Sequence, residues 1–125
     1  METLTVNSFV LDIDKSIAFY RILGFEPVMT VPPSGKLDWA MLQNGSVQIM
    51  LQTLDSLGSE LPAIDRSQPG GRLLFYIKIK GVRAFFKQVS EKVEVIKGLE
   101  KTFYGSTEFT IRDIDGFHLC FAEDE

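Results

Sequence analysis

The sequence has little of what marks secreted, membrane-spanning or nucleic-acid-binding proteins. Its 125 residues include one cysteine, which excludes an internal disulfide framework and favours a reducing compartment. No apolar run approaches the roughly 20 residues of a transmembrane helix. The first residues lack the basic region and apolar core of a signal peptide. We therefore expect a cytoplasmic protein with no membrane partner.

Concentrated charge of one sign is also missing. The chain has 13 lysines and arginines against 17 aspartates and glutamates, and no basic stripe is visible. Nucleic acid is therefore not an expected partner. Hydrophobic residues make up 45% and charged residues 24%, which is typical of a packed domain rather than a disordered chain.

The first half of the chain alternates between strand and helix patterns. Residues 4–11 are rich in strand formers, and Asp12 or Asp14 can cap the helix that follows. Gly24 ends that helix, because glycine readily adopts the left-handed conformation found there. The apolar face of the helix is predicted to be Ile13, Ile17, Tyr20 and Leu23. Strands are predicted at residues 25–31, 37–43 and 47–53, the last two joined at Asn44-Gly45.

The second half repeats this order. Residues 54–71 are rich in turn formers and predict a long linker with at most one helical turn. Ile13 and Val82, which begin the two predicted helices, are 69 residues apart. The strands predicted around the second helix, 82–89, are 72–80, 93–99, 107–112 and 117–122.

The repeat predicts an α+β fold of two β-α-β-β-β modules. One domain, 1–125, would hold module one at 1–53, the linker at 54–71 and module two at 72–125. Curved, antiparallel-rich sheets of this kind can enclose a cleft.

Two motifs in this pattern resemble the vicinal oxygen chelate superfamily, which includes glyoxalase I, extradiol dioxygenases, and fosfomycin and bleomycin resistance proteins. Residues 12–25, DIDKSIAFYRILGF, are similar to its D-x-x-x-S-x-x-F-Y-x-x-L-G-F start. Residues 113–116, Asp-Ile-Asp-Gly, are similar to its D-P-D-G turn, with isoleucine replacing proline. The resemblance covers nearly the whole chain. It implies paired modules with clefts at a module or dimer interface, and hence a homodimer.

The enzymes of that superfamily hold a divalent metal with His, Glu or Gln side chains, one from each of four strands. The resemblance places the corresponding positions at Thr5, Met50, Leu74 and Cys120. The first three side chains are poor ligands for a hard ion, and one thiol cannot hold a metal alone. We therefore expect no metal, no cofactor and no catalytic residue.

Other catalytic patterns are sparse. His118, the only histidine, lies two residues from Cys120 and shares its strand face, so a soft metal or nucleophilic chemistry is conceivable. The simpler interpretation is an ordinary polar strand residue. Asp113 and Asp115 are interpreted as turn residues that bind their own backbone.

Aromatic and sulfur-containing side chains are the positive signal. Trp39 is the strongest candidate, because an indole on an open sheet face stacks on planar or cationic ligands. Tyr104 is expected to close a pocket, and Glu108 or Asp38 to supply charge. Phe103 and Phe109 are further lining candidates. The predicted ligand-binding residues are Trp39, Met41, Met50, Leu74, Tyr76, Tyr104, Glu108 and Cys120.

The predicted function is metal-free binding of an aromatic or amphipathic small molecule in an apolar cleft, by resemblance to the bleomycin resistance proteins. The alternative is a glyoxalase- or dioxygenase-like lyase or oxygenase with a non-standard metal site. A third interpretation is a structural or regulatory module whose cleft is filled by its own side chains.

Overall fold

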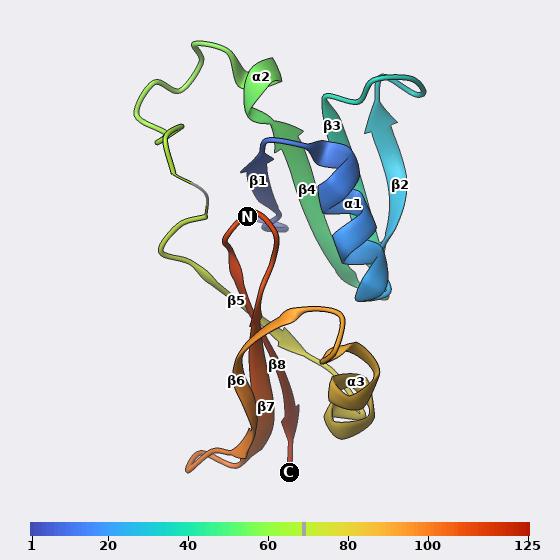
Figure 1. Cartoon of the computed structure of the whole chain (residues 1–125), viewed down its shortest axis with the longest axis vertical. Helices are drawn as coiled ribbons and strands as arrows, with labels where there is room; N and C mark the ends of the chain where they lie inside the picture. The colour runs from blue at the N-terminus through green and yellow to red at the C-terminus, as the bar shows by residue number, and fades with distance from the viewer. Residues whose placement is uncertain (69) are drawn as a thin grey trace. The chain divides into compact units, whose positions relative to one another are not determined.

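The computed structural model describes residues 1–68 and 70–125; Pro69, within the predicted linker, lies outside the described residues. The chain divides into two compact units, Met1–Pro69 and Gly70–Glu125. Each unit contains a four-stranded sheet with a helix on one face (Figure 1). No helix in the described parts of the chain is both long enough and apolar enough to span a bilayer.

The first unit has the predicted order of elements. Its strands lie in the order β1-β4-β3-β2, with β1 parallel to β4 and the other neighbours antiparallel. The elements are β1 (Val6–Val10), α1 (Ile13–Ile22), β2 (Glu26–Val31), β3 (Trp39–Asn44) and β4 (Val47–Thr53).

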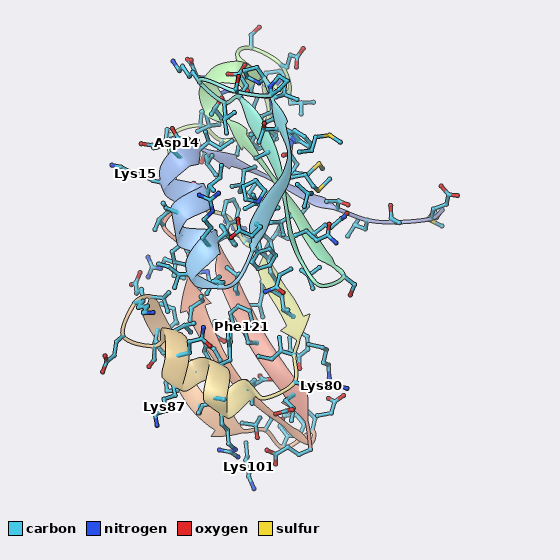
Figure 2. The ribbon with its side chains drawn as sticks, turned by 90° about the vertical axis from the view of Figure 1, so that its right-hand side faces the viewer. Asp14, Lys15, Lys80, Lys87, Lys101 and Phe121 are labelled. Atoms are coloured by element: carbon cyan, nitrogen blue, oxygen red, sulfur yellow. The ribbon has the colours of Figure 1, made fainter. Side chains whose placement is uncertain are left out.

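Helix α1 begins and ends where the sequence indicates. Of the two possible caps, Asp12 is the one used: its carboxylate accepts a hydrogen bond from the Lys15 backbone N–H at 3.2 Å. Gly24 follows the helix with φ 92°. The four predicted apolar residues of this helix face are all buried, and Tyr20 is 0% exposed. Asp14 and Lys15 point away from the sheet at the start of the helix (Figure 2).

The second unit repeats the arrangement with the strand order β5-β8-β7-β6 and β5 parallel to β8. Its elements are β5 (Leu74–Lys78), α3 (Val82–Val89), β6 (Glu94–Lys101), β7 (Ser106–Arg112) and β8 (His118–Asp124). The α+β fold of paired β-α-β-β-β modules is therefore confirmed, with strand ends that differ from the predicted ones by a few residues.

Helix α3 depends on a residue far away in the sequence. Its N-cap is Gly81, which has no side chain to satisfy the first N–H groups of the helix. The Glu123 carboxylate at the end of β8 accepts hydrogen bonds from the N–H groups of Gly81 at 2.8 Å and Val82 at 3.2 Å. The last strand therefore supplies the cap that the local sequence lacks.

Phe109 lies in the core of the second unit, and the expectation that it lines a ligand site is wrong. The ring is 1% exposed, and its centroid lies 5.0 Å from that of Phe86 and 5.3 Å from that of Phe121. Because side chains alternate along β7, Phe109 faces α3 while Glu108 faces the other way. Phe121 lies on the α3 side of the sheet, whereas Lys87 of α3 points outward (Figure 2).

In the turn between β7 and β8, Asp113 binds the backbone of its own turn, as the sequence predicts. The Asp113 carboxylate accepts hydrogen bonds from the backbone N–H groups of Asp115 and Phe117, both at 2.9 Å. Asp113 is 3% exposed, so its charge is committed to the turn rather than presented to a ligand.

The linker contains one short helix and an arginine-centred loop. Helix α2 (Leu54–Leu57) is capped by the Thr53 hydroxyl, which accepts from the Ser56 N–H at 3.1 Å. After it, the Arg66 guanidinium donates to backbone carbonyls of Gly58, Glu60, Leu61 and Ile64. One side chain thus holds the turn-rich segment in a defined conformation.

Candidate functional site

Each sheet has a face that points away from the helix of its own unit. We call them the α1-distal face and the α3-distal face. The α1-distal face is formed by Asn7, Phe9, Met29, Val31, Trp39, Met41, Met50 and Gln52. The α3-distal face is formed by Leu74, Tyr76, Lys78, Glu108, Thr110, His118 and Cys120.

The α1-distal face brings three predicted binding residues together. Met41 lies directly opposite Met50 on adjacent strands, and Trp39 lies opposite Gln52 one row further along. All three predicted side chains are half-buried, so each presents part of its surface. Indole and thioether groups form a polarisable, adaptable surface that suits planar apolar molecules.

Two further members of this face escaped the sequence analysis. Met29 lies opposite Met41 and is 61% exposed, and Phe9 lies opposite Gln52. A β-bulge between Pro27 and Met29 interrupts the simple alternation in β2, so the side on which Met29 lies could not be read from spacing. Phe9 requires the parallel pairing of β1 with β4, which only the tertiary structure supplies.

The α3-distal face is organised around one carboxylate, Glu108. It accepts hydrogen bonds from the Tyr104 hydroxyl at 2.6 Å, the Tyr76 hydroxyl at 3.1 Å and the Ser106 hydroxyl at 3.0 Å. The Cys120 thiol also lowers the pKa of this carboxylate. A carboxylate has about four acceptor positions, and hydroxyl groups of the protein occupy three of those of Glu108. Four predicted binding residues therefore meet here, with Ser106 as an addition that the sequence analysis missed.

Protonation in this cluster follows from these contacts. Burial by itself raises the pKa of Glu108, but the hydrogen bonds from Tyr104, Ser106, Tyr76 and Cys120 outweigh it and hold the pKa below the ordinary value. The bond to Glu108 raises the pKa of Tyr104 to about 12. Burial raises the pKa of the Cys120 thiol. Near neutral pH the titratable groups of the cluster are thus one carboxylate, Glu108, and three protonated groups, Tyr76, Tyr104 and Cys120.

A nucleophilic role for Cys120 is not supported by this geometry. A reactive cysteine needs a lowered pKa, whereas that of Cys120 is raised and the residue is 2% exposed. His118 shares its face but pairs with Leu74 and Arg112, one row away from the Tyr76–Cys120 pair.

Comparison with known families decides the relationship. The model of the Glyoxalase/Bleomycin resistance protein/Dioxygenase superfamily matches residues 4–121. The chain belongs to this superfamily. A search of curated protein sequences finds no match.

Solved structures share the fold over the full chain. A protein of unknown function from Agrobacterium tumefaciens strain C58 is 25% identical, with all of this chain and 95% of that chain covered and a TM-score of 0.82. A bleomycin resistance determinant encoded on transposon Tn5 is 22% identical, with 100% and 99% covered and a TM-score of 0.71. A bleomycin-binding protein in complex with bleomycin is 21% identical, with both chains fully covered and a TM-score of 0.67.

The four residues that the resemblance predicts at the superfamily's metal positions do not have the chemistry of ligands for a hard divalent ion. Thr5, just before β1, and Met50 belong to the first unit; Leu74 and Cys120 belong to the second. Only the thiol is a strong ligand type, and its protonated state opposes binding. Across residues 1–68 and 70–125, no three His, Cys, Asp or Glu side chains are grouped so that they could hold a metal.

The remaining predicted residues are more peripheral. Leu74 is 54% exposed at the start of β5, one row from Tyr76. Asp38 is exposed beside Trp39, and its backbone carbonyl accepts from the Thr53 N–H at 2.9 Å. Phe103 is 99% exposed and touches Tyr104.

A surface groove in the first unit lies elsewhere. It has a volume of about 460 Å³ and is lined by α1 residues such as Asp14 and Arg21 and by the turn after β2. None of the predicted binding residues lines it, so it does not enlarge either distal face.

Proposed function

We propose that the chain is a metal-free small-molecule-binding protein that sequesters an aromatic or amphipathic ligand. The observation that carries the proposal is the α1-distal face, where Trp39, Met41 and Met50 lie on adjacent strands with no ionisable side chain among them. Such a surface gains free energy by burying a planar apolar group, at roughly 25 cal/mol for each Å² removed from water.

Trp39 is the proposed stacking residue. Aromatic stacking adds about 0.5–1.5 kcal/mol beyond the burial of area, and the neighbouring thioethers adapt to the outline of a ligand. Within the superfamily, the bleomycin-binding protein similar in fold to this chain gives a precedent for small-molecule binding.

The α3-distal face supports an amphipathic ligand with a cationic group. Glu108 keeps its negative charge near neutral pH and accepts hydrogen bonds from the hydroxyls of Tyr76 and Tyr104. The rings of both tyrosines are partly exposed. The Lys78 ammonium lies 5.7 Å from the centre of the Tyr76 ring, and a cationic ligand would take its place over that ring.

The proposal includes three further properties: no resident metal, homodimer formation and a cytoplasmic location. The first rests on the donor chemistry at Thr5, Met50, Leu74 and Cys120. The second follows from the superfamily resemblance, and the third from the single cysteine. The enzymatic alternative, a lyase or oxygenase, needs a metal site built from other donors.

Calorimetric titration of chelator-dialysed protein with metal-free bleomycin and with the planar cation ethidium tests the proposal. We expect saturable binding that added chelator does not change. Trp39→Leu should weaken it about tenfold, equivalent to about 1.4 kcal/mol. Leu11→Ala is the control, because Leu11 is an exposed apolar residue outside both faces.

Three results would contradict parts of this proposal. A stoichiometric divalent ion that survives dialysis would favour the enzymatic alternative. Unchanged affinity in Trp39→Leu would remove the α1-distal face from the site. Sedimentation as a monomer at micromolar concentration would contradict the dimer.

A further inference from the structure

The α1-distal face contains a hydrogen-bond acceptor that the protein does not use. The Asn7 side-chain oxygen, Oδ1, is buried and has no partner. Asn7 lies on β1 directly opposite Met50, and Met41 is the next residue in the same row. These neighbours are thioethers and provide no donor.

A chain of hydrogen bonds fixes the orientation of the Asn7 amide. The Ser56 hydroxyl donates to the Thr53 carbonyl at 2.9 Å, so its oxygen accepts from Gln52 Nε2 at 3.4 Å. Gln52 therefore presents Oε1 to Asn7, whose Nδ2 donates to it at 3.0 Å. With its nitrogen used in this way, Asn7 leaves Oδ1 as a free acceptor.

The position of this acceptor distinguishes it from the other unpaired atom. Within the described residues, Ser8 Oγ is also buried without a partner. Ser8 points to the opposite face, which α1 covers, and is 2% exposed. Asn7 lies on the face that carries Trp39 and Met50, where a ligand can supply the missing donor once the flexible Met41 or Met50 side chain beside it changes rotamer.

We propose that Asn7 Oδ1 is a specificity-determining contact that accepts a hydrogen bond from an edge N–H or O–H of a planar aromatic ligand. This inference rests on the proposed function of the α1-distal face and names the ligand class: a ring system that stacks on Trp39 and carries a donor, such as a lactam, an amide or a phenol. A site built around a buried acceptor rejects an analogue without the donor more strongly than an apolar surface does, because that analogue leaves the acceptor unpaired.

Two probes that differ only in the replacement of the N–H hydrogen by a methyl group test the proposal. The probes are 2-quinolinone, a planar lactam with an N–H, and 1-methyl-2-quinolinone, in which a methyl group replaces that hydrogen. Binding is followed by NMR of the methionine methyl groups, since Met41 and Met50 flank Asn7. In the wild type we expect 2-quinolinone to bind about tenfold more tightly than its methyl derivative.

Three variants test whether the preference for 2-quinolinone over its methyl derivative depends on Asn7 Oδ1. Asn7→Leu keeps the size of the side chain and removes the acceptor, so both probes should bind alike. Asn7→Asp keeps an acceptor and should keep the preference. Gln48→Leu is the matched control, because Gln48 is an exposed amide two residues from Met50 that bonds only to Gln43 among the contacts described. It should leave the preference unchanged.

The outcomes separate this inference from the proposed function. Equal affinities in the wild type, with the Met41 and Met50 signals shifted, would overturn the role of Asn7 and leave ligand binding at this face standing. A preference that persists in Asn7→Leu would also overturn it. If neither probe shifts those signals at saturating concentration, both the role of Asn7 and ligand binding at the α1-distal face are contradicted.

Discussion

The two units share one topology but present different chemistry. The α1-distal face is built from an indole, thioethers and an amide whose oxygen has no partner. The α3-distal face is built around Glu108, which accepts hydrogen bonds from three hydroxyl groups of the protein. The α1-distal face thus contains an acceptor without a donor, whereas the acceptor of the α3-distal face is hydrogen-bonded within the protein. A repeated fold therefore determines where side chains lie, while the residues at those places determine what the surface can bind.

The two units also differ in how the N-terminus of their helix is capped. In α1 the cap is local, since Asp12 binds an N–H three residues later. In α3 it is distant, since Glu123 comes from the last strand. We expect the second unit to be the more cooperative of the two, because its helix cannot be capped before its sheet is complete.

The largest effect is expected in the second core. Phe109→Ala should lower the free energy of unfolding by about 3–5 kcal/mol, because it leaves a cavity among packed aromatic rings. Chemical denaturation should be followed by two probes, Trp39 fluorescence in the first unit and Cys120 thiol reactivity in the second. Phe103→Ala, at a fully exposed ring, is the control and should change stability little. An equally small effect at Phe109 would show that the ring is not the centre of this core.

Removal of the distant cap should have a smaller effect. Glu123→Ala leaves two helix N–H groups without their partner and should destabilise the chain by about 1–2 kcal/mol, compared with about 1 kcal/mol for Asp12→Ala. Glu123→Gln retains an acceptor and should lose less. Equilibrium denaturation measures all three. If Glu123→Ala proves neutral, the contrast between the two helix starts disappears.

A third pair of variants should differ in sign. Ser8→Ala removes an unpaired buried hydroxyl and should raise stability by up to about 1 kcal/mol. Ser16→Ala removes a buried hydroxyl that donates to the Asp12 carbonyl at 3.2 Å and should lower stability by about 1 kcal/mol. Thermal unfolding compares them, and a destabilised Ser8→Ala would mean that the hydroxyl has a partner after all.

The smallest effect concerns the pH dependence of the α3-distal face. Because the pKa of Glu108 is lower in the folded state than its ordinary value of 4.5, its contribution is present above that value. The contribution is lost as the pH falls through the lowered pKa. Glu108→Gln should remove this part of the acid sensitivity, measured by denaturation across a pH series from neutral to acidic.

The same variant should act at high pH with the opposite sign. The raised pKa of Tyr104 stabilises the fold below the ordinary value of 10.0 and ceases to do so as the pH rises through about 12. In Glu108→Gln, ultraviolet titration of the phenols should show Tyr104 ionising closer to 10.0. An unchanged titration would mean that Glu108 does not hold this hydroxyl.

Local patterns in the sequence were enough for the elements and for part of each face. The helix at 82–89, the turn at Asp113 and the repeated order all follow from spacing and turn chemistry. Tyr76, Tyr104, Glu108 and Cys120 were each selected as candidates from the sequence, although nothing local showed that they lie around one carboxylate. This arrangement depends on the register of β5, β8 and β7, which packing determines.

Other features had no local signal. Phe109 was named as a lining candidate but lies in the core, because the sequence of a strand does not reveal which of its faces a helix will cover. Asn7 was overlooked, because the lack of a partner for an amide oxygen is a property of its three-dimensional surroundings. Met29 was hidden by a bulge.

The first and last strands of each unit are neighbours: β1 runs beside β4 and β5 beside β8. Each sheet is consequently completed by its own segment of chain, and no ladder joins residues before position 69 to residues after it. The connection can thus be lengthened, or replaced by the junction of two polypeptides, without disrupting a ladder. An exchange of whole units between two copies of the chain would leave every strand ladder intact.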